Sequence, residues 1–382
     1  MANNNDNKVL NVPHLRFPEF SGEWKMCTIG ELTTKVGSGV TPRGGEAVYK
    51  TEGHPFVRSQ NVGLGNLLLD DIAFIDEETH LRQKSTELQF NDVLLNITGA
   101  SIGRSALVDK QIVGGNVNQH VCIIRTKENL VPSFICSFLL SNYGQRQIDS
   151  FQAGGNRQGL NFEQIKSIKI TIPSKDEQIK IAKLLRAIDE RIATQNKIID
   201  KLQSLIKGIA QNVARNNKPN IRLSECLECS SSTLQESNVC KNGTYPVYGA
   251  NGIVGYLDNY NTEKEAVYII KDGSGVGTVS YVTGKCSATG TLNTLQAKEG
   301  YSLQYLYYML KVFNFEPYKT GMAIPHIYFK DYGKAKIFCP SYTEQLKYAR
   351  LLSAIDNKLS AEQSILTDLS LQKQYLLRQM FI

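Results

Sequence analysis

Apolar and polar positions along residues 181–213 follow the pattern of a coiled-coil helix. From Ile181 the apolar residues recur at alternating steps of four and three positions, which is a heptad seam, and only Gln195 interrupts it. Adding 167 to each position gives the same pattern from Tyr348 onward, with the interruption kept at Glu362. The sequence therefore predicts two long helices with matching apolar seams.

The segments that begin these helices are nearly identical. "PSKDEQIKIAKLLRAIDERI" starts at Pro173 and "PSYTEQLKYARLLSAIDNKL" at Pro340, and 11 of the 20 positions agree. Both open with Pro-Ser and then Glu-Gln, which is typical of a helix start. The first helix should end near Arg215 and the second begin near Tyr342. Antiparallel packing makes those ends neighbours, whereas parallel packing would require the chain to return about 55 Å at 1.5 Å per residue. We expect an antiparallel coiled coil.

Gln195 and Glu362 would then occupy one central layer of the coiled coil. A buried polar layer fixes the register of such helices, and the alternative is that both side chains point outward at a local drift of the seam. The second seam is broken again at Lys373, so we expect its last turns to pack less well. The seam residues expected at the helix interface are Leu185, Ile188, Ile192, Gln195, Ile199, Leu202, Leu352, Ile355, Leu359, Glu362, Leu366 and Leu369.

The globular segment before each helix is repeated as well. "NITGASIGRSALV", residues 96–108, aligns with "IKDGSGVGTVSYV", residues 270–282, and further along we pair Asn118 with Asn293. Short Val, Ile, Leu and Tyr runs separated by Gly and Asn turns predict strands with a few helices. We therefore expect a mixed α+β fold with pseudo-two-fold repetition. Its parts are a first globular domain at 1–172, a central helix at 173–215, a second globular domain at 216–339 and a C-terminal helix at 340–382.

Composition and charge narrow the class of protein. The 382 residues suffice for two or three domains, and the net charge is +7. Residues 175–218 hold ten basic and five acidic side chains, while residues 1–174 are balanced. A basic helix can follow a phosphate backbone, although such a charge run is also typical of a solvated helix face. Neither a secretory signal nor a membrane-spanning run is visible, and eight irregularly spaced cysteines indicate reduced thiols, so we expect a cytoplasmic protein.

Motifs for catalysis are missing from the sequence. The glycine clusters lack the Lys-Ser or Lys-Thr of a phosphate-binding loop, and "PEFSGEWK" is too compressed for a metal-dependent nuclease. Cys226 and Cys229 could begin a zinc site, but no second such pair follows at a suitable distance. We expect no catalytic residue and no metal. Polar and Gly-rich loops recur in both globular segments instead, with the side-chain types that contact bases and phosphates.

Taken together, the chain resembles a DNA-specificity subunit of a Type I restriction–modification system. The resemblance covers nearly the whole length and is carried by "LRFPEFSGEWK", "PFVRSQNV", "NQHVCIIR", "YGANGIVGY", "ATGTLNTL" and, above all, the two helical segments with their Pro-Ser and Glu-Gln starts. It implies two target recognition domains, each reading half of a bipartite, asymmetric DNA sequence. The repeated helices would set the spacing and dock two modification (methyltransferase) subunits.

The same resemblance implies which chemistry belongs to the partners. S-adenosylmethionine for DNA methylation would be bound by the modification subunits, and ATP by restriction/translocase subunits, so this chain would carry no cofactor and would not be an enzyme. One alternative is a pseudo-symmetric coiled-coil scaffold that binds only proteins. Another is a fused methyltransferase or nuclease half with unrecognised motifs.

The residues expected to contact DNA lie in loops of the matching stretches. In the first domain they are Arg58, Gln60, Asn61, Thr98, Arg104, Asn118, Gln119, His120 and Arg157. In the second domain they are Tyr248, Asn251, Lys271, Ser274, Thr289, Asn293 and His326.

Overall fold

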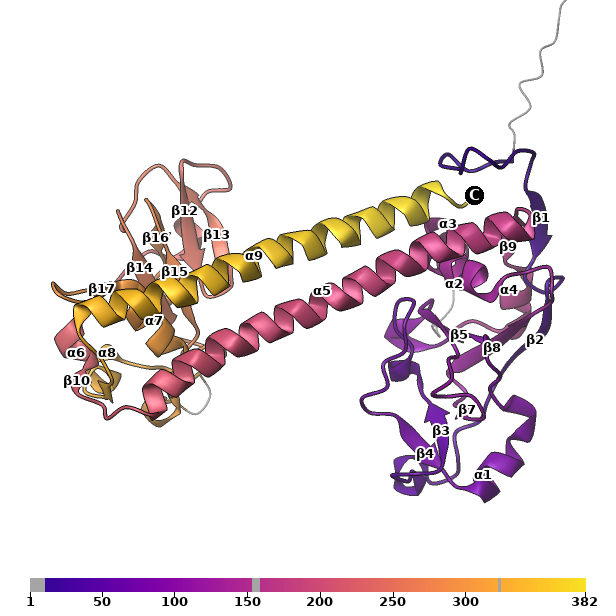
Figure 1. Cartoon of the computed structure of the whole chain (residues 1–382), viewed down its shortest axis with the longest axis horizontal. Coiled ribbons are helices and arrows are strands. Elements are labelled where there is room, and N and C mark those ends of the chain that lie inside the picture. Colours follow the sequence, from indigo (N-terminus) through magenta and orange to yellow (C-terminus); the bar gives the residue numbers. More distant parts are fainter. Residues whose placement is uncertain (1–10, 153–158, 322–323) are drawn as a thin grey trace, which may run out of the picture. The chain divides into compact units, whose positions relative to one another are not determined.

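The computed structural model describes residues 11–152, 159–321 and 324–382 (Figure 1). They form two compact units, one comprising residues up to Thr194 together with Leu366–Ile382, and the other comprising Gln195–Ile365. Each unit contains a domain of small sheets and short helices. Each also contains part of two long helices, α5 (Lys175–Arg215) and α9 (Tyr342–Gln379).

The first unit contains three small sheets. A four-stranded antiparallel sheet has the order β2-β8-β5-β6, a three-stranded sheet the order β4-β3-β7 with β3 and β7 parallel, and β1 pairs with β9. The strands are β1 (Lys25–Thr28), β2 (Thr33–Ser38), β3 (His54–Val57), β4 (Ala73–Ile75), β5 (Val93–Asn96), β6 (Ser105–Leu107), β7 (Asn116–Val117), β8 (Val121–Thr126) and β9 (Lys169–Ile172). The short helices are α1 (Glu77–Arg82), α2 (Pro132–Leu140), α3 (Asn142–Ser150) and α4 (Phe162–Ser167).

The second unit has the same sheets in the same order. They are β11-β17-β14-β15, β13-β12-β16 with β12 and β16 parallel, and the pair β10-β18. The strands are β10 (Ile221–Arg222), β11 (Leu227–Ser231), β12 (Tyr245–Gly249), β13 (Gly252–Leu257), β14 (Ala266–Ile270), β15 (Val279–Val282), β16 (Ser287–Ala288), β17 (Leu292–Ala297) and β18 (Lys336–Ile337). The short helices are α6 (Leu223–Cys226), α7 (Leu303–Lys311) and α8 (Phe329–Tyr332). The predicted mixed α+β fold with two similar domains is confirmed.

Strand pairing corrects one detail of the expected repeat, the pairing of Asn118 with Asn293. Asn118 precedes β8 and its amide donates to the carbonyl of Val57, whereas Thr289 precedes β17 and its amide donates to Tyr248. Thr289 is therefore the counterpart of Asn118. Asn293 lies inside β17, four residues beyond Thr289. Aligning the two stretches by residue identity alone therefore misplaces the counterpart of Asn118 by four positions.

A buried glutamine attaches each long helix to its own domain. The side chain of Gln178 accepts from the amide of Val131, just before α2, at 2.9 Å and donates to the carbonyl of Pro173 at 3.1 Å. Gln345 makes the same pair of bonds, accepting from Ser302 just before α7 at 2.9 Å and donating to Pro340 at 2.9 Å. Both glutamines are almost fully buried. The repeated Glu-Gln of the sequence thus has a packing function as well as a helix-start function.

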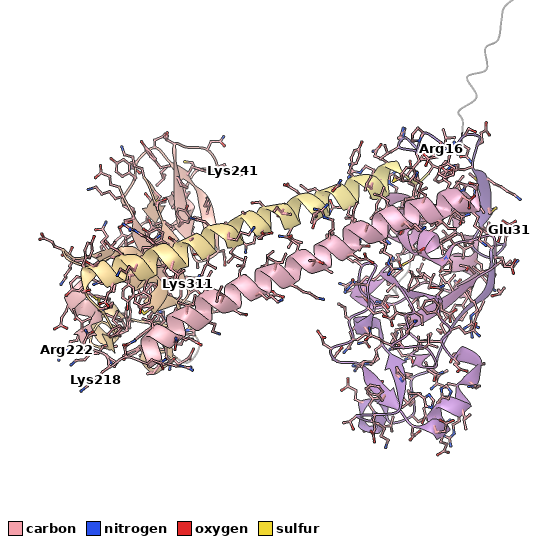
Figure 2. The ribbon with its side chains drawn as sticks, viewed as in Figure 1. Arg16, Glu31, Lys218, Arg222, Lys241 and Lys311 are labelled. Carbon is pink, nitrogen blue, oxygen red and sulfur yellow. The ribbon has the colours of Figure 1, made fainter. Side chains whose placement is uncertain are left out.

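In the first unit, the beginning of α5 lies beside the end of α9. The segment before β1 connects them, because the Leu15 amide donates to the carbonyl of Gln379 at 2.9 Å and the Arg16 guanidinium forms two bonds of 2.8 Å to the buried carboxylate of Glu177 (Figure 2). The pairing is therefore antiparallel, as predicted. Phe381, which is fully buried, packs against the rings of Phe134 and Phe138 in the domain core.

The expectation that α9 packs less well after Lys373 is wrong. The Lys373 ammonium pairs with the Asp189 carboxylate of α5 at 2.5 Å, and it also donates to the carbonyl of Leu64 at 3.2 Å. Beyond it, Leu376 and Met380 are buried in the core of the first unit. A long lysine stem with a paired head group replaces an apolar seam residue here without loosening the helix.

In the second unit, Gln195 and Glu362 face each other across the helix pair, which decides between the two alternatives left by the sequence. The Gln195 amide donates to the carbonyl of Glu362 at 2.9 Å and to its carboxylate, and Lys358 pairs with the same carboxylate. Only 8% and 6% of these two residues are exposed. Of the other expected seam residues, Leu185, Ile188, Ile199, Leu352, Leu359 and Leu369 are buried, while Ile192, Leu202, Ile355 and Leu366 are half-buried.

This polar layer predicts a pH dependence of stability. The neighbouring Lys358 ammonium and the Gln195 amide hold the pKa of Glu362 below its ordinary value of 4.5. A carboxyl whose pKa is lowered by folding stabilises the fold above its unfolded pKa, and that contribution is lost as the pH falls through the folded value. We expect Glu362→Gln to lower the urea midpoint at neutral pH, and the difference from wild type to shrink below pH 4.5. The control is Glu190→Gln, on an exposed face of α5, which should change neither the urea midpoint at neutral pH nor its dependence on pH.

Candidate nucleic-acid interface

Four segments of the first domain that carry predicted DNA contacts meet at one edge. The Asn118 amide donates to Val57 at 3.1 Å, and the Ile97 amide donates to His120 at 3.0 Å. The Leu160 amide then donates to the carbonyl of Ile97 at 2.8 Å. Backbone hydrogen bonds therefore join the loops that follow β3, β5 and β7 to the segment that precedes α4.

The second domain builds the same edge with the same backbone bonds. The Thr289 amide donates to Tyr248 at 2.9 Å, and the Lys271 amide donates to Thr291 at 3.0 Å. The Ile327 amide donates to the carbonyl of Lys271 at 2.9 Å. We call these two sets of joined loops the first and second loop edges. Their backbones agree, whereas their side chains differ.

Most of the predicted contact residues lie at least partly accessible on these edges. Exposed ones are Gln60, Gln119, Asn251 and Ser274, and half-buried ones are Arg58, Thr98, Arg104, His120, Tyr248, Lys271 and His326. Arg157 lies outside the described residues. Whether these side chains contact DNA stays a prediction.

Four of the predicted contact residues are buried and support the loops instead. Asn61, which is fully buried, accepts from the Arg58 amide and donates to the Leu68 carbonyl and the Asp71 carboxylate, each at 2.9 Å. The side chain of Asn118 accepts from the amide of residue 120. The remaining two, Thr289 and Asn293, bond to Thr291 and Tyr332 inside the second domain. The sequence does not separate such residues from contact residues, because Asn and Thr serve both purposes.

Arg58 is less available than the sequence indicated. Its guanidinium donates to the Asp71 carbonyl at 2.7 Å, lies 3.7 Å from the Glu46 carboxylate, and stacks over the Tyr49 ring at 5.4 Å. Only 14% of its side chain is exposed. The charge of Arg58 is therefore largely balanced within the first domain.

Two residues at the loop edges were missed by the sequence reasoning. Asp272 accepts from the ring of His326 at 2.7 Å, and Thr41 donates its amide to the side chain of Gln119 at 2.9 Å. Asp272 lies within the quoted "IKDGSGVGTVSYV" stretch, next to Lys271, but an acidic residue was not expected among the candidate DNA contacts. Thr41 carried no sequence signal, since its contribution comes from its backbone.

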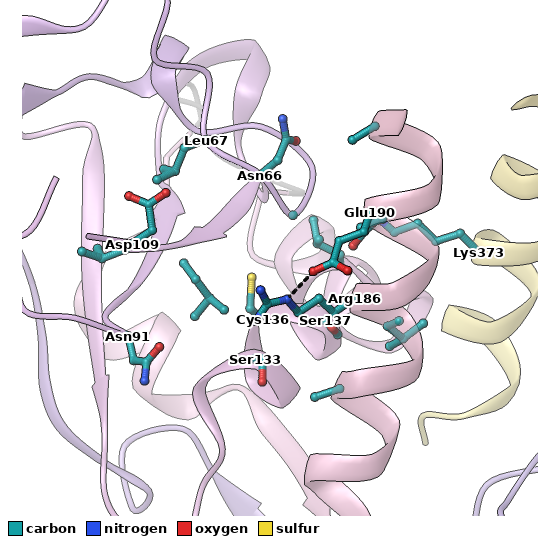
Figure 3. A pocket seen from close by; sticks show the side chains of 18 of the residues that line it. Asn66, Leu67, Asn91, Asp109, Ser133, Cys136, Ser137, Arg186, Glu190 and Lys373 are labelled. Carbon is teal, nitrogen blue, oxygen red and sulfur yellow. Dashed lines mark hydrogen bonds and ion pairs between the residues drawn. The ribbon is translucent and has the colours of Figure 1, made fainter. Parts of the chain in front are cut away.

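Each unit also contains a hollow between its domain helix and the long helices. The first, of about 650 Å³, lies among α2, α5 and α9, with Ser137, Leu140, Lys373 and Leu377 in its wall (Figure 3). The second, of about 390 Å³, is lined by Tyr308, Lys311, Ile206 and Ala210, which occupy the corresponding positions of the repeat. Figure 2 shows Lys311 beside the paired helices. The two hollows thus share four positions of the repeat, whereas the loops that also line the first have no counterpart in the wall of the second.

Burial raises the pKa of the Cys226 thiol to about 12 and that of Cys229 to about 11. Within the described ranges, His, Cys, Asp and Glu side chains form no group of three or more suited to a metal.

The helices of the described part of the chain include none that is long and apolar enough to span a membrane.

A family model for the Type I restriction modification DNA specificity domain matches the chain twice, over residues 21–204 and 219–370. These matches cover most of the chain, which therefore belongs to this family of DNA specificity proteins. As a member of this family, the chain is a recognition subunit and not a catalytic one, and its partners are DNA and restriction–modification subunits.

Individual relatives agree with this assignment. A putative type I specificity subunit of Mycoplasma genitalium is 25% identical over 320 residues, which cover 76% of this chain and 81% of the relative. The EcoKI specificity subunit of Escherichia coli is 23% identical over 202 residues, but the match spans only 41% of that protein. A crystal structure of the S subunit from M. genitalium covers 97% of this chain and is itself covered to 99%, with a TM-score of 0.67 at 19% identity. At that identity the similarity supports the fold.

The reassignment of Asn61 predicts a defect in folding. Asn61→Ala removes three partly buried hydrogen bonds of a fully buried side chain, so we expect a loss of about 2–3 kcal/mol in the free energy of unfolding. The matched control is Asn251→Ala, because Asn251 is exposed and lies on the equivalent edge. Urea unfolding of both variants tests this, and equal midpoints would show that Asn61 has no structural role.

Proposed function

We propose that this chain reads a bipartite, asymmetric DNA sequence, one half with each loop edge, and positions modification subunits on it. The observation that carries the proposal is that one backbone arrangement of four loops is built twice in one chain. A repeated backbone with different side chains suits two half-sites of different sequence.

The side chains of the two edges suit this role by their hydrogen-bonding chemistry. Gln60, Gln119 and Arg104 lie on the first edge, and Asn251 and Ser274 on the second. Amide groups can bond two atoms of one base edge at once, arginine can bond guanine or phosphate, and hydroxyls bond either bases or phosphates. The differences between the two sets support different half-site sequences.

Two modification subunits per chain are supported by the hollows of the two units, which share four positions of the repeat. Each hollow combines the C-terminal part of a domain helix, α2 or α7, with both long helices. Identical partners need similar docking surfaces, which an internal repeat provides. A solved relative whose structure concerns complex assembly and conformational transition of the type I system covers 93% of this chain at a TM-score of 0.55.

The chemistry of the complex is assigned to those partners. We expect the modification subunits to bind S-adenosylmethionine and to methylate the DNA, and restriction/translocase subunits to bind ATP. Because the proposed ligand is DNA, we place the complex in the cytoplasm.

The first experiment compares DNA methylation across the host genome with the gene intact and deleted. We expect one split motif with a fixed gap to lose its methylation in the deletion strain, because the modification subunits would no longer be positioned. Exchanging the segment 216–339 for that of a relative should alter one half of the motif and leave the other unchanged.

The same comparison has a defined negative outcome. Unchanged methylation, with the modification subunit present and active, would contradict the DNA-reading function. The pseudo-symmetric scaffold that binds only proteins would then be favoured, whereas salt-dependent DNA binding by the assembled complex would count against that scaffold.

The docking proposal is tested by filling each hollow separately. Ala193→Arg in the first hollow and Gln203→Arg in the second should each reduce the modification subunits bound per chain from two to one, as measured by native mass spectrometry. Thr194→Arg and Ser204→Arg are matched controls, because these residues are exposed neighbours outside the hollow walls. Full assembly of the Ala193 and Gln203 variants would place the docking surfaces elsewhere.

A further inference from the structure

Thr98 and Asp272 occupy the same position in the two loop edges. Each lies two residues beyond the end of its strand, β5 or β14. Each also forms an antiparallel bridge with the segment before a short helix, Thr98 with Gly159 before α4 and Asp272 with His326 before α8. The same position of the repeated fold therefore carries a hydroxyl in the first domain and a carboxylate in the second.

In the first domain, a chain of hydrogen bonds fixes the direction of every proton that leads to Thr98. The Thr41 amide can only donate, so the oxygen of the Gln119 amide accepts from it at 2.9 Å. The Gln119 nitrogen therefore donates to His120 Nε2 at 3.3 Å, and the His120 proton lies on Nδ1. His120 Nδ1 then donates to Thr98 Oγ1 at 2.6 Å. Within the described residues no acceptor takes the Thr98 hydroxyl proton, which can therefore be donated outward.

In the second domain, the residue at the equivalent position leaves a hydrogen-bond acceptor facing outward instead of a donor. The Asp272 carboxylate only accepts, so the His326 Nδ1 that lies 2.7 Å away carries a proton. The His326 backbone is fixed by hydrogen bonds in both directions with Thr320, at 2.7 and 2.8 Å. In its neutral form the ring presents Nε2 as an acceptor, and 35% of the side chain is exposed. Nε2 forms no hydrogen bond within the described part of the chain.

We propose that Thr98 and Asp272 determine the hydrogen-bond polarity of the two loop edges. Thr98 donates its hydroxyl proton to an acceptor on the first half-site. Asp272 acts as a positioning residue that holds His326 with Nε2 directed at a donor on the second half-site. This inference rests on the proposed DNA-reading function.

The two polarities define different classes of DNA group. A donated hydroxyl proton suits a phosphate oxygen or the N7, O6 and O4 acceptors of the major groove. A ring nitrogen acceptor suits the exocyclic amino groups of adenine and cytosine, which are the donors presented there. Phosphates offer no donor, so the contact of His326 is made to a base and contributes to sequence discrimination.

The test uses the assembled methyltransferase complex and duplexes that carry the split motif found by methylation mapping. Thr98→Val keeps the shape and removes the proton, so we expect affinity to fall about three- to ten-fold, whereas Thr98→Ser keeps affinity within about two-fold. Asp272→Asn supplies an amide that can donate to Nδ1 and move the ring proton to Nε2, and a similar loss is expected. His326→Ala should add little to the loss caused by Asp272→Asn.

A second set of duplexes locates each effect and identifies the DNA group. With the second half-site scrambled, Asp272→Asn should no longer differ from wild type. Scrambling the first half-site distinguishes the two kinds of acceptor open to Thr98, because the Thr98→Val loss should disappear if the acceptor is a base and persist if it is a phosphate oxygen. Unsubstituted purine in place of single adenines, and zebularine in place of single cytosines, lack the exocyclic amino group. At one position of the second half-site, such a replacement should remove the Asp272→Asn effect.

The outcomes separate failure of this inference from failure of the proposed function. If wild type does not distinguish the motif from scrambled duplexes, the proposed function fails. If wild type discriminates but Thr98→Val behaves like Thr98→Ser, or if the Asp272→Asn loss persists on a scrambled second half-site, the assigned polarity is wrong.

Discussion

The buried glutamine at the start of each long helix is the constraint on which each domain depends. Gln178 and Gln345 each join the beginning of a long helix to the beginning of a shorter domain helix, using both ends of one amide. Replacing such a group would leave a backbone donor and a carbonyl unpaired in the interior, which is costly. The domains could therefore diverge in their loops while their attachment to the helices stayed the same.

Equivalent positions elsewhere show how far the divergence has gone. Asp189 and Asp356 correspond in the repeat, but the first pairs with Lys373 of α9 and the second accepts from the hydroxyl of Tyr308 in α7. Both positions keep a carboxylate, but its partner lies in α9 in the first unit and in α7 in the second. Similarly, Glu177 is buried under Arg16, whereas Glu344 remains exposed and, among the described residues, accepts a side-chain hydrogen bond from Ser341 at the start of its own helix. Repetition of the fold thus coexists with different local chemistry.

The sequence predicted the features that depend on periodicity and repetition. The two helices, their antiparallel pairing and the mixed α+β domains follow from patterns that span many residues. What it could not predict was set by single hydrogen bonds between distant segments. The inward orientation of Gln195 depends on its contact with Glu362, and Asn61 is buried although the sequence places it among the contact residues, because an amide can serve equally well in a loop support and in a contact. Thr41 contributes through its backbone alone, which leaves no trace in the sequence.

The burial of Phe381 in the core of the first domain has a consequence for biosynthesis. That core combines residues that precede the second unit in the sequence with residues that follow it, because Leu376, Met380 and Phe381 pack with residues such as Trp24 and Phe134. A ribosome makes the amino-terminal part first, yet its apolar interior stays incomplete until residues 366–382 have emerged. The second unit, Gln195–Ile365, is continuous and can fold earlier during translation. The first unit, whose synthesis begins first, is therefore the last to complete its fold.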